Sequence, residues 1–312
     1  ILLMITFMIN RPSITKEHSF TGHKDAIYAL CGLNEHEFVS GGADGHIIKW
    51  DTNGYAAGDV VAKVSTSVYA LSYDPLRGHL FIGQNFDGLH VIDPIAKREI
   101  ASLQMTKAHI FDIQFDDDFL YIATGDGAIY IVSRESWKLV KMLNLSQKSA
   151  RTLQVDEHHI YAGYSDGYIR VIDKKNHKLI QEIQAHENSI FSLRIDPTNK
   201  MILSGSRDAH LKIWSLEDAK ALHLVEDIVA HMYAINHISY HSNGHYFVTC
   251  SMDKSIKIWD SGTFKLIRVI DKGRYAGHGT SVNKLLSMPN KNSLISCSDD
   301  RTISVWDINF SK

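Results

Sequence analysis

The segment SGGADGHIIKWD, residues 40–51, decides how this chain folds. It begins as the end of an apolar strand, turns at Asp44-Gly45, and continues as an alternating strand that ends at Trp50-Asp51. Asp-Gly is a favoured hairpin turn, and alternation with period two is typical of strands rather than helices. The segment therefore predicts a β-hairpin.

Six similar hairpins follow along the chain. The seven copies close on Asp or Ser at positions 51, 93, 133, 173, 215, 260 and 307, so consecutive copies are separated by 42, 40, 40, 42, 45 and 47 residues. An alternating apolar strand precedes each hairpin, and a more polar strand follows most of them. Four short strands in a unit of this length are typical of a propeller blade. The sequence therefore predicts an all-β fold, a seven-bladed β-propeller of four-stranded antiparallel blades, with residues 1–312 forming a single domain.

The two ends of the chain complement each other. Only five residues follow the last hairpin, too few for a fourth strand, whereas residues 1–22 precede the first unit. We expect the N-terminal strand, around residues 13–20, to complete the last blade and close the ring, which leaves only short edges. The apolar run Ile1–Ile9 is too short to span a bilayer and lacks the charged start of a signal peptide. We expect residues 1–10 to form an apolar strand or tail.

Four units, the first and the fifth to seventh, carry a His, a Ser or Thr, an Asp and a Trp at near-constant spacing, with the hydroxyl residue four before Asp and Trp six after it. Together with the repeat, this pattern resembles the WD40-repeat family over nearly the whole chain. In that family the four residues form a buried hydrogen-bond chain from Trp to hydroxyl to His to Asp. The resemblance implies such structural tetrads at His23, Ser40, Asp44 and Trp50; His186, Ser204, Asp208 and Trp214; His231, Thr249, Asp253 and Trp259; and His278, Ser296, Asp300 and Trp306. Ser, His and Asp also occur together in hydrolase triads, but fourfold repetition with a Trp favours the structural role.

The second, third and fourth units depart from this pattern. Trp is replaced by Ile92, Val132 and Ile172, and the loop His by Val64, Thr106 and Ser146. We expect these three blades to depend on apolar packing alone.

The loop before each unit and the turn at its Asp are expected on the same face of the ring, which we call the top face. The candidate binding residues lie in and beside these loops and turns. WD40 proteins commonly bind partners there, through residues beside the first apolar residue of each unit and before the turn Asp. The resemblance implies partner-binding roles for Tyr28, Tyr69, Phe86, His109, Phe111, Arg151, Phe191, Arg207, Asn236, Met252, Asn283 and Asp299. Aromatic and arginine side chains often dominate interface energies. The alternative is that the rings only fill space between blades.

The function predicted from these residues is a non-catalytic scaffold that binds a peptide or protein partner, acts as a monomer, and needs no cofactor or metal. Charged residues make up 22% of the chain and its net charge is −2, so no global charge indicates nucleic acid or membrane as a partner. Three cysteines, Cys31, Cys250 and Cys297, do not make a disulfide framework and indicate a reducing, cytoplasmic location. A reader of methyl-lysine or phosphorylated peptides, a propeller enzyme and a nucleic-acid binder remain alternatives.

Overall fold

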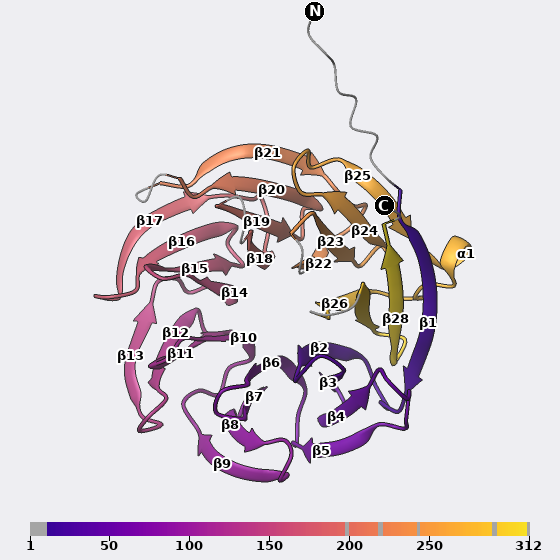
Figure 1. The fold of residues 1–312 in the computed structure, drawn as a ribbon. Helices are drawn as coiled ribbons and strands as arrows, with labels where there is room; N and C mark the ends of the chain where they lie inside the picture. The colour runs from indigo at the N-terminus through magenta and orange to yellow at the C-terminus, as the bar shows by residue number, and fades with distance from the viewer. Residues whose placement is uncertain (1–10, 197–199, 218–220, 242–243, 289–291, 311–312) are drawn as a thin grey trace, which may run out of the picture.

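A computed structural model describes residues 11–196, 200–217, 221–241, 244–288 and 292–310. Figure 1 shows them as seven sheets arranged in a ring, each of four antiparallel strands. The predicted propeller is confirmed. The expected N-terminal strand or tail at 1–10 lies outside the described residues. No helix in the described part of the chain is long and apolar enough to cross a membrane.

The strands of each blade are named from the centre of the ring outward. The first strands are β2 (Ile27–Gly32), β6 (Val68–Asp74), β10 (Ile110–Phe115), β14 (Ala150–Val155), β18 (Ile190–Asp196), β22 (Ile235–Tyr240) and β26 (Val282–Ser287), in blades 1 to 7. The second strands are β3 (Glu37–Gly42), β7 (His79–Gln84), β11 (Phe119–Thr124), β15 (His159–Tyr164), β19 (Met201–Ser206), β23 (Tyr246–Ser251) and β27 (Ser293–Ser298).

The outer half of each blade completes its sheet. The third strands are β4 (His46–Asp51), β8 (Gly88–Asp93), β12 (Ala128–Ser133), β16 (Tyr168–Asp173), β20 (His210–Ser215), β24 (Ile256–Asp260) and β28 (Thr302–Asn309). The fourth strands are β5 (Asp59–Lys63), β9 (Arg98–Leu103), β13 (Leu139–Asn144), β17 (Lys178–Gln184), β21 (His223–Val229), β25 (Leu266–Ile270) and, in blade 7, β1 (Ser13–Thr21). A single-turn helix, α1 (Lys272–Tyr275), follows β25.

The N-terminal strand closes the ring, as predicted. Strand β1 pairs antiparallel with β28, and Phe20 lies opposite Ile303. Residues from the two ends of the chain therefore share one sheet, and β1 supplies the fourth strand of the last blade.

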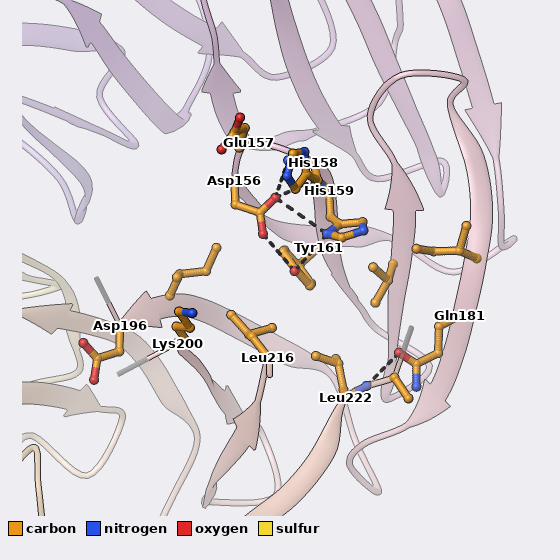
Figure 2. Close-up of a pocket in the computed structure, with 14 residues that line it drawn as sticks. Asp156, Glu157, His158, His159, Tyr161, Gln181, Asp196, Lys200, Leu216 and Leu222 are labelled. Atoms are coloured by element: carbon orange, nitrogen blue, oxygen red, sulfur yellow. Dashed lines mark hydrogen bonds and ion pairs between the residues drawn. The ribbon is translucent and has the colours of Figure 1, made fainter. Parts of the chain in front are cut away.

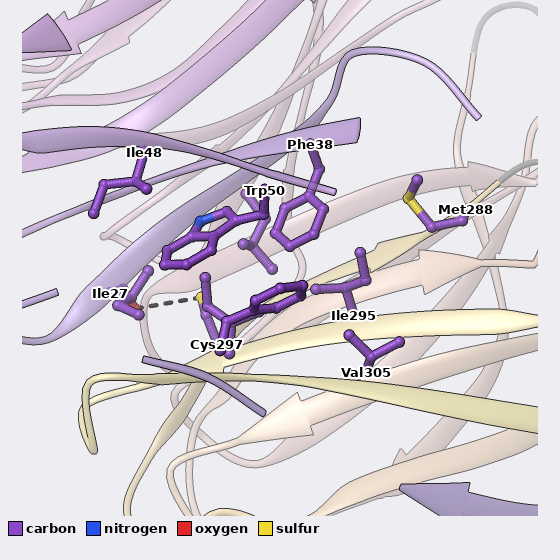
Figure 3. Packing of buried hydrophobic residues seen from close by; sticks show 11 residues of the cluster. Ile27, Phe38, Ile48, Trp50, Met288, Ile295, Cys297 and Val305 are labelled. Atoms are coloured by element: carbon purple, nitrogen blue, oxygen red, sulfur yellow. Dashed lines mark hydrogen bonds between the residues drawn. The ribbon is translucent and has the colours of Figure 1, made fainter. Parts of the chain in front are cut away.

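Apolar side chains fill the space between neighbouring blades. Each of seven buried clusters draws its members from two consecutive blades. Figure 3 shows the cluster at the closure, where Phe38 and Trp50 of blade 1 pack with Ile295, Cys297 and Val305 of blade 7. The second strands are almost wholly buried, whereas fourth strands such as β13 are mostly exposed. Exposure does not make every fourth strand polar, because Leu139, Val140 and Met142 on β13 are 50%, 51% and 44% exposed.

The four tetrads form continuous buried hydrogen-bond chains. In blade 1, Trp50 Nε1 donates to Ser40 Oγ at 2.7 Å, Ser40 Oγ lies 2.7 Å from His23 Nε2, and His23 Nδ1 lies 3.0 Å from Asp44. Blades 5, 6 and 7 repeat this, with Trp–hydroxyl distances of 2.9, 2.9 and 2.8 Å. A neutral imidazole fits this chain best, because Nε2 accepts from the hydroxyl while Nδ1–H donates to the carboxylate.

Blades 3 and 4 do not depend on apolar packing alone, and that expectation is wrong. Thr106 Oγ1 donates to Asp126 at 3.0 Å, and Ser146 Oγ donates to Asp166 at 2.8 Å. Both hydroxyls stand where the tetrads have His, so a shorter side chain bonds to the same turn carboxylate. In blade 4, Arg170 adds two hydrogen bonds to Asp166, at 3.1 and 3.0 Å.

Blade 2 has a different polar network. His90 on β8 lies 2.8 Å from Gln84 Oε1, and Gln84 Nε2 donates to Ser65 Oγ at 2.8 Å. Gln84 is almost fully buried, so this network stabilises the interior of the blade as the tetrads do elsewhere.

Acidification from pH 7 to pH 5 is expected to lower the thermal midpoint. Burial lowers the pKa of His23, His186 and His231, although their aspartate partners act in the opposite direction. Because the unfolded state, with a histidine pKa of about 6.5, takes up these protons first, stability present at pH 7 is lost as the pH falls below that value. A midpoint that stays constant or rises over this range in calorimetry would contradict tetrads whose histidines are neutral.

Candidate functional site

Every first strand carries a β-bulge at the same place. The pairing with the second strand skips one residue directly after the strand's first residue. The skipped residues are Tyr28, Tyr69, Phe111, Arg151, Phe191, Asn236 and Asn283. A bulge leaves its extra residue unpaired and redirects its side chain. The seven bulge residues are one from each blade, at the top of the central channel.

The bulge is followed by hydrogen bonds between blades. The residue after the bulge accepts a backbone N–H from the next blade in four consecutive pairs of blades. These bonds run from Leu153 to Asp112 (2.8 Å), Leu193 to Thr152 (3.2 Å), Ile238 to Ser192 (3.0 Å) and Leu285 to His237 (3.3 Å). The first strands of blades 3 to 7 are thereby fixed to one another, so the bulge side chains of these five blades are held in a rigid frame.

All seven bulge residues line one cavity of about 490 Å³, which we call the channel mouth. Ten of the twelve candidate partner-binding residues line it: Tyr28, Tyr69, His109, Phe111, Arg151, Phe191, Asn236, Met252, Asn283 and Asp299. Phe86 and Arg207 do not line it. Phe86 is 53% exposed and packs on the His109 ring, 4.5 Å between centroids, whereas Arg207 is exposed on the turn before β20.

Ser281 and Lys284 also line the channel mouth and were not among the candidate residues. Lys284 directly follows a bulge residue, Asn283. The sequence pattern covered the residues on either side of the apolar start of each unit and the residue before the turn Asp, so it included position 281 as a small residue but not position 284. A rule that also included the second residue would have found Lys284.

Blades 1 to 3 give the channel mouth a continuous aromatic wall. The Tyr28 and Tyr69 rings lie 4.8 Å apart, and Tyr69 lies 5.8 Å from Phe111. His109 stacks on Phe111 at 5.5 Å. Burial and the neighbouring Arg151 lower the pKa of His109, so its ring is neutral at pH 7. This wall offers a peptide broad apolar contact with little loss of side-chain entropy.

Arg151 lies between the aromatic rings of its two neighbouring blades. Its guanidinium carbon is 3.7 Å from the centre of Phe111 and 4.8 Å from that of Phe191. Burial lowers the pKa of Arg151 to about 10, so it stays charged at neutral pH. Within the described residues, its guanidinium makes no hydrogen bond and no ion pair, and its donors therefore remain available to a ligand.

The opposite wall is tied more tightly to the scaffold. The Asn236 amide donates to Val282 O at 2.8 Å, and the Asn283 amide donates to Ile27 O at 2.9 Å. Asn283 also donates to Asp299 Oδ1 at 2.8 Å. These amides join blades 6, 7 and 1, so part of their hydrogen-bonding capacity is already used.

A second cavity, of about 480 Å³, lies between blades 4 and 5 (Figure 2). Its lining includes Asp156, His158, His159 and Tyr161. Asp156 accepts from the backbone N–H groups of both histidines, at 2.7 and 2.6 Å, and from the Tyr161 hydroxyl at 2.9 Å. These bonds close a turn, so this carboxylate is committed to local structure. Across the described residues, no group of three or more His, Cys, Asp or Glu is placed to hold a metal ion.

Arg151→Met is expected to change the free energy of unfolding by less than about 1 kcal/mol, towards greater stability. A guanidinium whose pKa is lowered in the folded state opposes folding at neutral pH, and no carboxylate offsets this for Arg151. Met keeps the contacts with the two rings without the charge. Urea unfolding of both proteins measures the difference, and a loss of several kcal/mol would show that the arginine supports the fold.

Two family models match the chain. The model described as "WD domain, G-beta repeat" matches residues 14–51, 177–215, 223–260 and 270–307, and the model described as "Anaphase-promoting complex subunit 4 WD40 domain" matches residues 116–195. The four ranges matched by the G-beta repeat model coincide with the four units that carry complete tetrads. A search of curated proteins gives no match.

Seven closed blades, buried Trp-to-Asp chains and an open top face define the class of WD-repeat propellers. The chain belongs to the WD40-repeat family. WD40 propellers commonly mediate protein interactions and are generally non-catalytic scaffolds.

Proposed function

We propose that this chain is a non-catalytic scaffold that holds a peptide segment of a protein partner at the channel mouth. The observation that carries the proposal is the placement of all seven bulge side chains around one cavity, with aromatic rings from consecutive blades on one wall. Aromatic residues in a partly exposed, concave site on a rigid frame are typical interface anchors. The general role of WD40 propellers supports the same conclusion.

The proposal treats residues 1–312 as one domain that acts as a monomer in the cytoplasm. Three free cysteines support a reducing compartment. One matched family model is described as the domain of a complex subunit, and we propose that the partner here also belongs to a protein assembly.

The cations at the channel mouth do not favour a reader of methylated lysine. Arg151 already contacts Phe111 and Phe191, and Lys284 lines the same cavity. A ligand cation placed over these rings would meet like charges. The peptide that fits is neutral or anionic at this position.

Tyr69→Ala is expected to reduce partner capture at least tenfold while the thermal midpoint changes by less than about 4 °C. The ring contacts Tyr28 and Phe111 at the mouth and is only half-buried, so its loss removes binding surface more than core. Affinity capture from a native lysate with quantitative mass spectrometry measures the loss.

The matched controls are Leu76→Ala and Ile95→Ala. These side chains are 90% and 81% exposed, on loops that open away from the top face. We expect them to leave capture unchanged. Equal capture by Tyr69→Ala and the wild type, or a loss with the two controls alone, would contradict the proposal.

A further inference from the structure

Among the described residues, two cations line the channel mouth without a carboxylate partner. Arg151 and Lys284 both line the cavity, and in the described part of the chain neither side chain makes a hydrogen bond or an ion pair. The one carboxylate that lines it, Asp299, accepts a hydrogen bond from Asn283 at 2.8 Å. With His109 neutral, two positive charges face a single negative charge, and the cavity carries an excess positive charge.

We infer that the occupant of the channel mouth is an acidic peptide, which places a carboxylate side chain against Arg151 and an apolar side chain on an exposed surface of blade 6. This inference rests on the proposed function and adds the chemistry of the partner. It assigns to Arg151 the role of anion receptor.

The surroundings of Arg151 suit a carboxylate. Rings from both neighbouring blades contact the guanidinium, so its N–H edge is the part left to bind a ligand. A stacked guanidinium is held in one orientation and loses little freedom when it binds a planar carboxylate through two parallel hydrogen bonds. Because the cation is already desolvated, an arriving anion also gains more than it would at an exposed arginine.

A phosphate fits less well than a carboxylate. Phosphorylated motifs are usually bound by clusters of arginines. Here Arg207, the second arginine expected at this face, is exposed on its turn and does not line the cavity. One arginine and one lysine, with Asp299 in the same cavity, match a singly charged carboxylate better than a phosphate dianion.

The apolar surface is the blade 6 shelf, which we define as Met232, Tyr233 and Met252. These side chains are 81%, 61% and 51% exposed. Met252 also lines the channel mouth, and its N–H donates to Ala234 O at 3.0 Å, which joins the turn to the loop that carries the other two. The shelf is therefore continuous with the cavity. Methionine adapts to different apolar partners, so the shelf can receive an apolar side chain of a peptide that enters the cavity.

The test is a selection of random twelve-residue peptides displayed on phage, using the whole chain as bait. We expect the enriched peptides to share an Asp or Glu together with a large apolar residue. Synthetic copies of the best peptide are then titrated by fluorescence anisotropy. Arg151→Met is expected to weaken binding at least tenfold, Arg151→Lys less, and Tyr233→Ala about threefold. Arg98→Met, which removes an exposed arginine from the rim strand β9, serves as the control and is expected to have no effect.

The outcomes separate this inference from the proposed function. Failure to enrich any peptide would overturn both. Enriched peptides without a shared acid, or equal binding after Asp or Glu is replaced by Asn or Gln, would overturn the inference alone. A phosphoserine peptide that binds tenfold tighter than its aspartate version would replace the carboxylate with a phosphate. Thermal midpoints of the variants show whether a lost affinity reflects a lost fold.

Discussion

Asp74→Ala is expected to lower the free energy of unfolding by about 3–5 kcal/mol. Asp74 forms a buried ion pair with Arg134, and both side chains are only 3% exposed. Arg134 also donates to the backbone carbonyl of Asp116 and stacks on Phe115, with its guanidinium carbon 4.8 Å from the ring centre. The pair links the first strand of blade 2 to blade 3. Removal of the carboxylate would leave a charged guanidinium buried without a counter-ion, which is the source of the large effect.

The matched control for this pair is Asp59→Ala. Asp59 pairs with Lys97 at 2.6 Å, but the two side chains are 50% and 44% exposed. Such surface pairs contribute at most about 1 kcal/mol. Guanidinium chloride unfolding of both variants gives the comparison. Losses of equal size would show that the Asp74 pair is not the interblade link that its burial indicates.

Ser296→Ala is expected to lower the free energy of unfolding by about 2–4 kcal/mol, the second large effect. Ser296 is fully buried, accepts from Trp306 Nε1 at 2.8 Å, and lies 2.8 Å from His278 Nε2. Its removal would leave two buried polar groups unsatisfied. Each unsatisfied buried group lowers the free energy of unfolding by about 1–3 kcal/mol. One hydroxyl oxygen therefore holds the hydrogen-bond chain of blade 7 together.

Blade 7 itself offers the control, Ser304→Ala. Ser304 is as deeply buried as Ser296, but within the described residues its Oγ has no hydrogen-bond partner. Loss of an unsatisfied buried hydroxyl is expected to leave stability unchanged or raise it. Chemical denaturation distinguishes the two serines, and equal effects would contradict the importance of the tetrad bonds.

The sequence predicted the repeat, the blade number and the closure, because these follow from features that recur every 40–47 residues. Alternation, turn residues and the lack of a fourth strand after Asp307 can all be recognised in the sequence itself. Polar networks in blades 2 to 4 were missed because they use other residue types. Thr106 and Ser146 bond to the turn Asp as a histidine would, yet neither matches the family pattern.

The sequence predicted where the channel mouth lies, but not how its side chains contact one another. One residue per blade could be identified because the bulge occurs at the same place in every unit, although the bulge itself cannot be seen in an alternating pattern. The placement of Arg151 between Phe111 and Phe191 depends on three blades lying side by side, which spacing along the chain does not reveal. For the same reason, the sequence alone could not show that Arg151 lines the channel mouth whereas Arg207 does not.

Site-specific photocrosslinking tests the central claim, that the channel mouth holds the partner, most directly. p-Benzoylphenylalanine in place of Tyr69 would stand in the aromatic wall, and the same group in place of Ile95 would stand on a loop of the opposite face. Irradiation in a native lysate, followed by mass spectrometry, is expected to give a covalent partner adduct from position 69 and none from position 95. An adduct from position 95 with none from position 69 would contradict the account.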